Sequence, residues 1–397
     1  MGYELGSDFM ADMKKVAFIM LYNILEGAGN ENWLLNLLSD TNFASKYDIT
    51  VYQPDLYLTK RLDEETVNRI LKTVNVVTYH DYIHKIDFLN SNKITRLFSE
   101  SLLKPIFLRV LSATLMRKVS RNISSNDVVY LFSNEYQGLI RKGPQLVIGT
   151  THNWSPGWTN IFGKIRLKLI EDGIIMSKID AFNFFSISSQ RKMDCKRFRT
   201  EIIPICRNSK SFIPRDSDKN AIIFTFVGRL VQCKGVMEVL SAWKRSGIGQ
   251  YAELHIVGSG PMLREITANE EINIFVHGNV ATDELKRILS ISDYFLFPTK
   301  CDTFGSVVIE AAMSGNYVFC SKFLEGEFDD LREKNILEYI EPSEDGVAIA
   351  LAKAMKRGKL SQSEKMYFHS YMASNYDISI LDRKLTAFIE SNTISAR

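Results

Sequence analysis

The sequence predicts an α/β protein with two domains, each built around a parallel β-sheet that helices cover on both faces. The chain has 397 residues, about twice the size of a common domain. Short apolar, β-branched runs alternate with longer helical patterns, which is typical of parallel strands buried on both faces. Hydrophobic residues make up 45% and charged residues 24%, the ordinary composition of a folded globular protein.

Eleven runs are predicted as strands, in two sets. The first set is Val16–Tyr22, Ile49–Tyr52, Val74–Thr78, Val128–Phe132, Leu146–Thr150 and Phe182–Ile187. The second set is Ile222–Gly228, Glu253–Gly258, Ile272–His277, Tyr294–Pro298 and Asn316–Ser321. Two sets of strands separated by helices indicate two doubly wound domains.

The domain boundaries follow from composition. A polar stretch around Pro214 marks the joint, so we expect a first domain over residues 13–208 and a second over residues 209–360. Only helical patterns follow Pro342, at Asp345–Arg357 and Ile378–Ser391. Residues 361–397 are therefore expected to be C-terminal helices, the last of which packs back on the first domain. Residues 1–12 lack the apolar core of a signal peptide, and no run reaches the ~18 apolar residues of a transmembrane helix.

The cysteines are few and odd in number. They are Cys195, Cys206, Cys233, Cys301 and Cys320, and none forms a C-x-x-C pair. This pattern predicts reduced thiols in a cytoplasmic protein and argues against a disulfide framework.

Charge is unevenly distributed along the chain. The net charge is +3, but residues 1–215 carry 29 Lys and Arg against 21 Asp and Glu. Seven of these cations lie in Asn92–Ile123, interleaved with leucines, against the single acid Glu100. Such a segment can lie on an anionic membrane surface, and the alternative is a domain helix whose basic side is solvated. Nucleic-acid binding is not expected, because aromatic platforms are absent among the cations.

The second half carries the chemical signals. Its first strand ends at Gly228, and the cations Arg229 and Lys234 follow before a helix. The carboxyl end of a strand beside a helix N-terminus is where open α/β sheets bind anions such as a diphosphate. Two further glycines, Gly258 and Gly260, form a G-x-G-P turn that exposes backbone after the next strand.

Two more segments complete the predicted site. Asn279 and Val280 follow a strand and are expected to border a nucleobase. The run 302–315 then predicts a helix that begins near Gly305. Three residues at its start, Phe304, Gly305 and Ser306, offer amides to a phosphate or sugar oxygen, and Asp302 and Glu310 offer carboxylates to hydroxyl groups. The alternative is that Asp302 only caps the helix while Glu310 faces solvent.

In these motifs the second half resembles the retaining GT-B glycosyltransferases, specifically glycosyltransferase family four. The resemblance rests on the G-R and K-G pairs, the G-x-G-P turn and an E-x7-E-like element, and it covers Ile222–Gly315 well. It implies two Rossmann-like domains that face each other across a cleft. It also implies transfer of a sugar from a UDP- or GDP-type nucleotide sugar, with Arg229, Lys234, Asp302 and Glu310 in catalytic roles.

The first half resembles the same family more loosely. Gly27 and Gly29 match its glycine-rich first loop, which faces the donor phosphates, and His152 matches its active-site histidine. The segment Ile203–Asn208 resembles the family's P-N-G-V hinge but lacks its Asn-Gly. Three departures in the second half leave the donor sugar open: the first acid of the E-x7-E element is Asp302, the usual Pro after the helix glycine is Asn316, and the loop 322–327 lacks the family's glycine-rich form.

The resemblance implies a front-face mechanism in which the leaving diphosphate helps to remove the acceptor proton. Paired cations and free backbone amides can stabilise a leaving diphosphate without a metal, so neither a metal nor a cofactor is expected. His80 and His84 have the i, i+4 spacing of zinc ligands but lack an adjacent Glu and a third ligand. The sequence is compatible with four kinds of acceptor: a lipid-linked sugar, a soluble glycan, a protein or a small metabolite. The basic segment favours a protein peripheral to the cytoplasmic membrane face.

Three other functions are compatible with the architecture. A sugar-nucleotide epimerase can share the two-domain fold, and a phosphorylase would need a much longer chain with a pyridoxal lysine or a phosphate site. A non-catalytic GT-B-like protein would be expected to lack the phosphate site, yet Arg229, Lys234 and Glu310 are all present.

Overall fold

The computed structural model describes residues 13–20, 23–26, 29–55, 67–68, 71–72, 74–79, 117–132, 140–141, 143–150, 178–191, 198–217, 220–268, 273–302 and 304–394. The chain divides into two compact units. The first unit comprises Met1–Phe185, Ser189–Ile203 and Leu381–Arg397, and the second comprises Ser186–Ser188 and Pro204–Ile380. Relative to the predicted boundaries, the joint lies a few residues earlier and only the last helix returns to the first unit.

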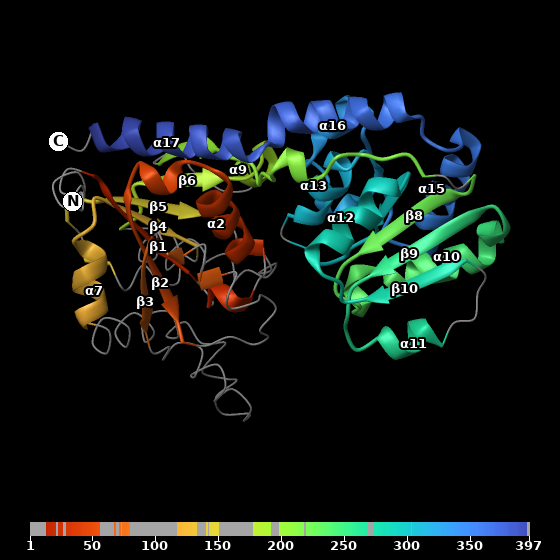
Figure 1. The fold of residues 1–397 in the computed structure, drawn as a ribbon, viewed down its shortest axis with the longest axis horizontal. Coiled ribbons are helices and arrows are strands. Elements are labelled where there is room, and N and C mark those ends of the chain that lie inside the picture. The colour runs from red at the N-terminus through yellow and green to blue at the C-terminus, as the bar shows by residue number, and fades with distance from the viewer. Residues whose placement is uncertain are drawn as a thin grey trace, which may run out of the picture. The chain divides into compact units, whose positions relative to one another are not determined.

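The first unit is built on a seven-stranded sheet in the order β3-β2-β1-β4-β5-β6-β7 (Figure 1). Its strands are β1 (Lys15–Ile19), β2 (Asp48–Pro54), β3 (Asn75–Tyr79), β4 (Val128–Leu131), β5 (Leu146–Thr150), β6 (Ala181–Phe184) and β7 (Arg199–Ile202). Every neighbouring pair is parallel. The predicted strand over Phe182–Ile187 is too long, because it ends at Phe184 and helix α9 (Ile187–Arg191) follows.

Apolar side chains bury both faces of this sheet, as its continuous apolar strands predict. On one face Phe18 and Tyr130 pack together, and Trp33 of helix α2 (Gly29–Asp40) stacks on Tyr130 with 5.5 Å between ring centroids. On the other face Ala17 and Val129 join a second buried cluster. Because successive side chains of β1 and β4 point to opposite faces of the sheet, each strand contributes to a hydrophobic core on both faces.

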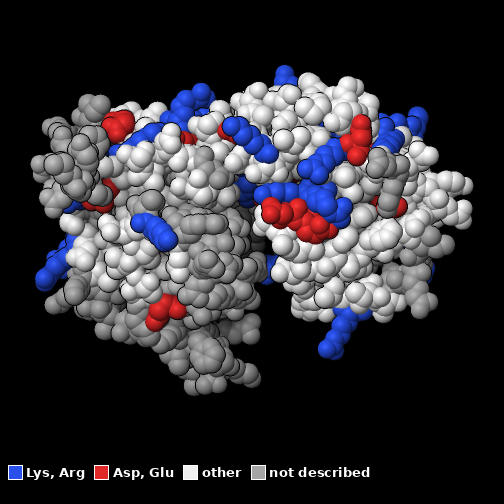
Figure 2. Space-filling view, in the orientation of Figure 1, with Lys and Arg blue, Asp and Glu red and all other residues white. Residues whose placement is uncertain are grey.

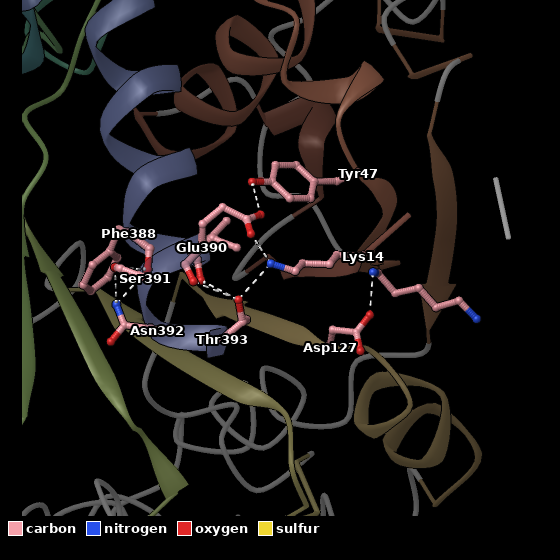
Figure 3. Close-up of polar contacts among 10 residues, drawn as sticks. Lys14, Tyr47, Asp127, Phe388, Glu390, Ser391, Asn392 and Thr393 are labelled. Atoms are coloured by element: carbon pink, nitrogen blue, oxygen red, sulfur yellow. Dashed lines mark hydrogen bonds and ion pairs between the residues drawn. The ribbon is translucent and has the colours of Figure 1, made fainter. Parts of the chain in front are cut away.

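The C-terminal helix α17 (Ile378–Ile394) covers part of the first unit. The side chains of Leu381, Leu385 and Ile389 are fully buried. Polar contacts add to this packing at the end of the helix, where Glu390 accepts hydrogen bonds from the Lys14 ammonium and, at 3.1 Å, from the Tyr47 hydroxyl (Figure 3). Helix α17 is thus an integral part of the first unit's core.

The second unit is built on a six-stranded parallel sheet in the order β10-β9-β8-β11-β12-β13 (Figure 1). Its strands are β8 (Ile222–Val227), β9 (Ala252–Val257), β10 (Ile274–Gly278), β11 (Tyr294–Phe297), β12 (Tyr317–Ser321) and β13 (Leu337–Ile340). Its helices are α10 (Val236–Ser246), α11 (Leu263–Thr267), α12 (Thr282–Ile291), α13 (Ser306–Met313), α14 (Asp329–Glu333), α15 (Glu344–Arg357) and α16 (Gln362–Tyr376). Strand β13 was not predicted, whereas α16 lies within the predicted helical segment 361–397.

Helix α16 is fixed to the second sheet by a buried ion pair. The Lys365 ammonium lies 3.0 Å from the Asp293 carboxylate, and both side chains are fully buried. The second oxygen of Asp293 accepts the Ile223 amide at 3.0 Å, at the start of β8. The pair therefore joins α16 to the amino ends of β8 and β11.

On the face shown in Figure 2, Lys and Arg side chains of the described residues lie with Asp and Glu among them. Helix α7 (Arg117–Ser124) contains the described part of the basic segment Asn92–Ile123, and residues 92–116 lie outside the described residues. Within the described part of the chain, no helix is long and apolar enough to span a bilayer.

Candidate functional site

The carboxyl ends of β8 and β9 approach each other closely. The Gly228 amide donates a hydrogen bond to the Val257 carbonyl at 3.0 Å. A Cβ at Gly258, where φ is 140°, would lie 1.8 Å from the Gly228 carbonyl oxygen, and one at Gly260 would lie 2.5 Å from the Leu230 carbonyl oxygen. Because glycine alone fits this approach, backbone is exposed where open α/β sheets bind ligands.

Lys234 and Asp302, two predicted catalytic residues, form an ion pair. The Lys234 ammonium lies 2.6 Å from one Asp302 carboxylate oxygen and also donates to the Cys301 carbonyl at 2.9 Å. The two side chains are 12% and 19% exposed, so water screens the attraction only partly. The pair places a cation and a carboxylate together between the loop after β8 and the loop before α13.

A disulfide bond lies next to this ion pair. Cys233 and Cys301, the residues that directly precede Lys234 and Asp302, are bonded, and 68 positions separate them in sequence. The prediction that the cysteines are reduced is therefore wrong for this pair. Cys206 and Cys320 are free and buried, whereas Cys195 lies outside the described residues. Sequence spacing missed the disulfide because two distant loops create it.

Asp302 also shapes the entry to helix α13. Its second carboxylate oxygen accepts the Gly305 amide at 3.1 Å, and Gly305 precedes the helix with φ of 79°. The Ser306 and Val307 amides of the first turn have no partner one turn earlier within the helix. Asp302 thus both caps this turn and pairs with Lys234, while the positive end of the helix dipole lies beside it.

Glu310 lies one turn into α13, where its side chain is 16% exposed. The Arg207 Nε donates to its Oε1 at 2.8 Å, and the Arg207 side chain is only 6% exposed. The solvent-facing alternative for Glu310 is therefore wrong. Arg207 is a residue that motif reasoning missed. Arg207 stands where the hinge motif P-N-G-V has its valine, and this departure marks an unusual residue without indicating Glu310 as its partner.

The remaining donor-side residues lie in the same unit. Arg229 is exposed directly after Gly228, and it forms no ion pair with any residue that the structure describes. Its guanidinium is therefore available to an anion. Phe304, by contrast, is 4% exposed and packs against Phe328, so only its backbone can contact a ligand.

The turn predicted to border a base follows β10. Asn279 is exposed and Val280 half-buried. Two histidines lie beside this turn, with His255 Nδ1 2.9 Å from His277 Nε2. Burial lowers the pKa of His277, and the charge of nearby Glu284 opposes this shift only in part. At neutral pH the His277 imidazole beside this turn is therefore uncharged.

Several of the residues that the sequence analysis singled out lie in parts of the chain that the structure does not describe. Gly27, His152, His80 and His84 lie outside the described residues, and Gly29 is the first residue of α2. Among the described residues, no group of three His, Cys, Asp or Glu side chains is arranged to hold a metal ion.

A cavity of about 350 Å³ lies elsewhere, in the first unit. It is lined by residues 143–146 with Asp180, Arg199 and Asn392, at the amino ends of β5 to β7. It contains none of the predicted site residues. The cluster in the second unit, built from loops at the carboxyl ends of strands, is therefore the stronger candidate site.

Sequence comparison matches this second unit to a known family. Residues 209–366 match the model of the family Glycosyl transferases group 1. A curated relative, the gpi3 subunit of phosphatidylinositol N-acetylglucosaminyltransferase from Schizosaccharomyces pombe, is 24% identical over 166 residues. That match covers 40% of this chain and 36% of the relative, so the chain aligns with about a third of that protein's length.

Structural comparison extends to nearly the whole chain. Sucrose-phosphate synthase from Thermosynechococcus elongatus superimposes with a TM-score of 0.68 at 14% identity, covering 96% of this chain and 100% of that one. HepE from Anabaena, in complex with UDP and glucose, gives a TM-score of 0.65 at 13% identity over 96% and 100% of the two chains. An Escherichia coli trehalose-6-phosphate protein bound to UDP-2-fluoro glucose gives 0.65 at 14% identity over 95% and 99%. Residues 209–366 are thus a glycosyl transferases group 1 domain, and the chain that carries it has the GT-B fold of glycosyltransferases.

Proposed function

We propose that the protein is a retaining glycosyltransferase that moves a sugar from a nucleoside diphosphate sugar to an acceptor hydroxyl. The observation that carries the proposal is the grouping of Lys234, Asp302 and Glu310 around the start of α13, inside the family-matched domain. The solved relatives HepE and the Escherichia coli protein bind UDP or a UDP sugar. This supports UDP as the first donor nucleotide to test, with GDP as the second.

The proposed chemistry is a front-face displacement. The bond between the sugar C1 and the diphosphate oxygen breaks, the bond between C1 and the acceptor oxygen forms, and the acceptor proton passes to the departing diphosphate. Lys234 and Arg229 stabilise the charge that grows on that diphosphate, and no metal is assigned to this role. His152 is assigned to orient the donor sugar. Both described carboxylates are paired with cations, which favours hydroxyl binding over attack on the sugar.

The proposed acceptor is a lipid-linked sugar or glycan at an anionic membrane surface. Two observations support it: the curated relative's name includes phosphatidylinositol, and residues 92–123 are rich in Lys and Arg. Cosedimentation with vesicles that contain anionic lipid tests the membrane part. Replacing Lys104, Arg109, Arg117 and Lys118 with Ser is expected to abolish binding, and unchanged binding would remove this part of the proposal.

The central test is a donor screen. Thermal unfolding is followed with UDP, GDP, ADP and their hexose conjugates, because a ligand that binds only the native state stabilises it by about 2.7 kcal/mol at one hundred times its Kd. The donor that binds is then incubated with and without candidate acceptors, and the product anomer is read by NMR. Retained configuration in an acceptor-dependent product is expected. Conversion of the donor without acceptor would identify an epimerase, and no binding of any nucleotide would overturn the proposal.

A further inference from the structure

Arg207 is a buried cation that pairs with the candidate carboxylate Glu310, and the proposed mechanism gives it no role. It follows the joint between the two units, in the second unit. The residue is 5% exposed, and its guanidinium donates at 2.8 Å to Glu310 and at 3.0 Å to the Cys206 carbonyl. A buried arginine is expensive unless its charge is paired, so Glu310 and the Cys206 carbonyl compensate for its burial.

The contact occupies one side of the Glu310 carboxylate. Arg207 Nε reaches Oε1, while no residue that the structure describes donates a hydrogen bond to Oε2. A glutamate with a free side chain would exchange among several rotamers. With Oε1 held, the carboxylate keeps one orientation, and Oε2 is the acceptor left for a ligand.

The backbone of Arg207 is itself held in place. Its amide donates to the Tyr376 carbonyl at 3.0 Å, and its carbonyl accepts the Ile378 amide at 2.9 Å, in a parallel bridge with Asp377. Burial alone would raise the pKa of Asp377, but hydrogen bonds from Ser209 and Ser379 outweigh it and lower that pKa. An ionised Asp377 thus ties the Arg207 segment to the end of α16.

We propose that Arg207 is the positioning residue for Glu310, and that it presents Oε2 to the ribose hydroxyls of the donor nucleotide. The inference rests on the proposed function, because it assumes a nucleoside diphosphate at this site. Arg207 acts through Glu310 and does not contact the substrate. Its effect is therefore specific to the ribose, whereas a purely structural arginine would affect every nucleotide equally.

The test compares each ribonucleotide with its 2′-deoxy counterpart. Kd is measured by calorimetry for UDP, 2′-deoxy-UDP, GDP and 2′-deoxy-GDP on the wild-type protein and on Arg207→Met. Loss of one hydrogen bond to a charged group corresponds to a preference of about ten-fold or more for the ribonucleotide in the wild type. In Arg207→Met that ratio is expected to fall toward one, and Arg207→Lys, which keeps the charge without the planar fork, is expected to be intermediate.

A double variant separates positioning from direct contact. Arg207→Met/Glu310→Ala leaves no buried charge unpaired, so it remains testable if Arg207→Met alone fails to fold. If Arg207 acts only through Glu310, the double variant binds UDP no more weakly than Glu310→Ala does. The matched control is Arg245→Met on α10, which removes exposed ion pairs with Glu344 and Asp345 of α15 and is expected to leave all ratios unchanged.

The outcomes distinguish this inference from the proposed function. A wild-type protein that binds none of the nucleotides removes both. A wild-type protein that binds UDP or GDP, combined with an unchanged ribose preference in Arg207→Met, overturns the role of Arg207 alone. An additional loss of UDP affinity in the double variant relative to Glu310→Ala overturns it as well, because Arg207 would then contact the nucleotide directly.

Discussion

At the scale of single residues, the Lys234–Asp302 pair is the centre of the candidate site. Lys234 is needed as a cation for a diphosphate, yet in the structure it already has a carboxylate partner at 2.6 Å. Because Asp302 also accepts the Gly305 amide, it cannot turn away without loosening the start of α13. The lysine is therefore held at a fixed point close to the first-turn amides of the helix.

Replacing Lys234 with Met is expected to lower kcat/KM by about a hundred-fold or more, because truncating one partner of a partly buried charge pair costs roughly 2–5 kcal/mol and the diphosphate loses a cation. Steady-state kinetics with the donor found in the screen measures this. Lys353→Met is the control, since Lys353 pairs with Glu338 on the surface. Equal kinetics in Lys234→Met and the control would show that Lys234 plays no part in the reaction.

Sequence motifs identified some of these residues and not others, for a physical reason. Lys234 and Asp302 stand in motifs that follow strand ends, and Glu310 lies one turn into the helix after Gly305, so their positions along the chain already indicate the ligand-binding side of the sheet. Arg207 and the Cys233–Cys301 bond depend on contacts between segments far apart in sequence. A single sequence without a fold gives no distance between such segments, so these contacts could not be predicted.

At the scale of elements, the strands were predicted best where they are apolar throughout. β1, β4 and β8 are buried along almost their whole length, and their runs were read correctly within a few residues. β7 was missed because its sequence, Arg-Thr-Glu-Ile, is mostly polar at an edge of the first sheet. Helix α16 was predicted only as part of the helical segment 361–397, without bounds of its own, because its polar and aromatic residues alternate without a clear apolar face. Its buried Lys365 pairs with Asp293, a residue far away in sequence.

The disulfide is the element-scale feature with the clearest consequence. It closes a loop of 68 residues, and in the chain-entropy model such a cross-link stabilises the folded state by about 4 kcal/mol. It also joins the loops that carry Lys234 and Asp302. We expect Cys233→Ser/Cys301→Ser to lower both the unfolding temperature and the affinity for UDP or GDP, with denaturant unfolding and calorimetry as the measurements.

Reductant provides the matched control for this expectation. A reducing agent should shift the wild-type protein toward the double variant and leave the double variant unchanged, because no bond remains to be reduced. If thiol titration of the denatured, unreduced wild-type protein finds every cysteine free, the disulfide is absent in solution and the expectation fails.

At the scale of the whole molecule, the chain returns to its first unit at the end. The sequence predicted that the last helix packs on the first domain, and Leu381–Arg397 are part of the first compact unit. The preceding helix α16 belongs to the second unit, however, so the predicted C-terminal helical segment 361–397 is divided between the two. Composition could not locate that division, because both helices have similar polarity and no Gly or Pro separates them.

This return makes the stability of the first unit depend on residues far along the chain. Leu385 and Ile389 are fully buried on α17, and replacing each with Ala costs about 2–5 kcal/mol. Leu385→Ala/Ile389→Ala is expected to lower the unfolding transition of the first unit and to leave the nucleotide-stabilised transition of the second unit in place. Differential scanning calorimetry with and without UDP measures both transitions, and Arg383→Ala, at an exposed position of the same helix, is the control. If the double variant lowered both transitions equally, the two units would unfold as one cooperative body, and α17 would stabilise the whole molecule and not the first unit alone.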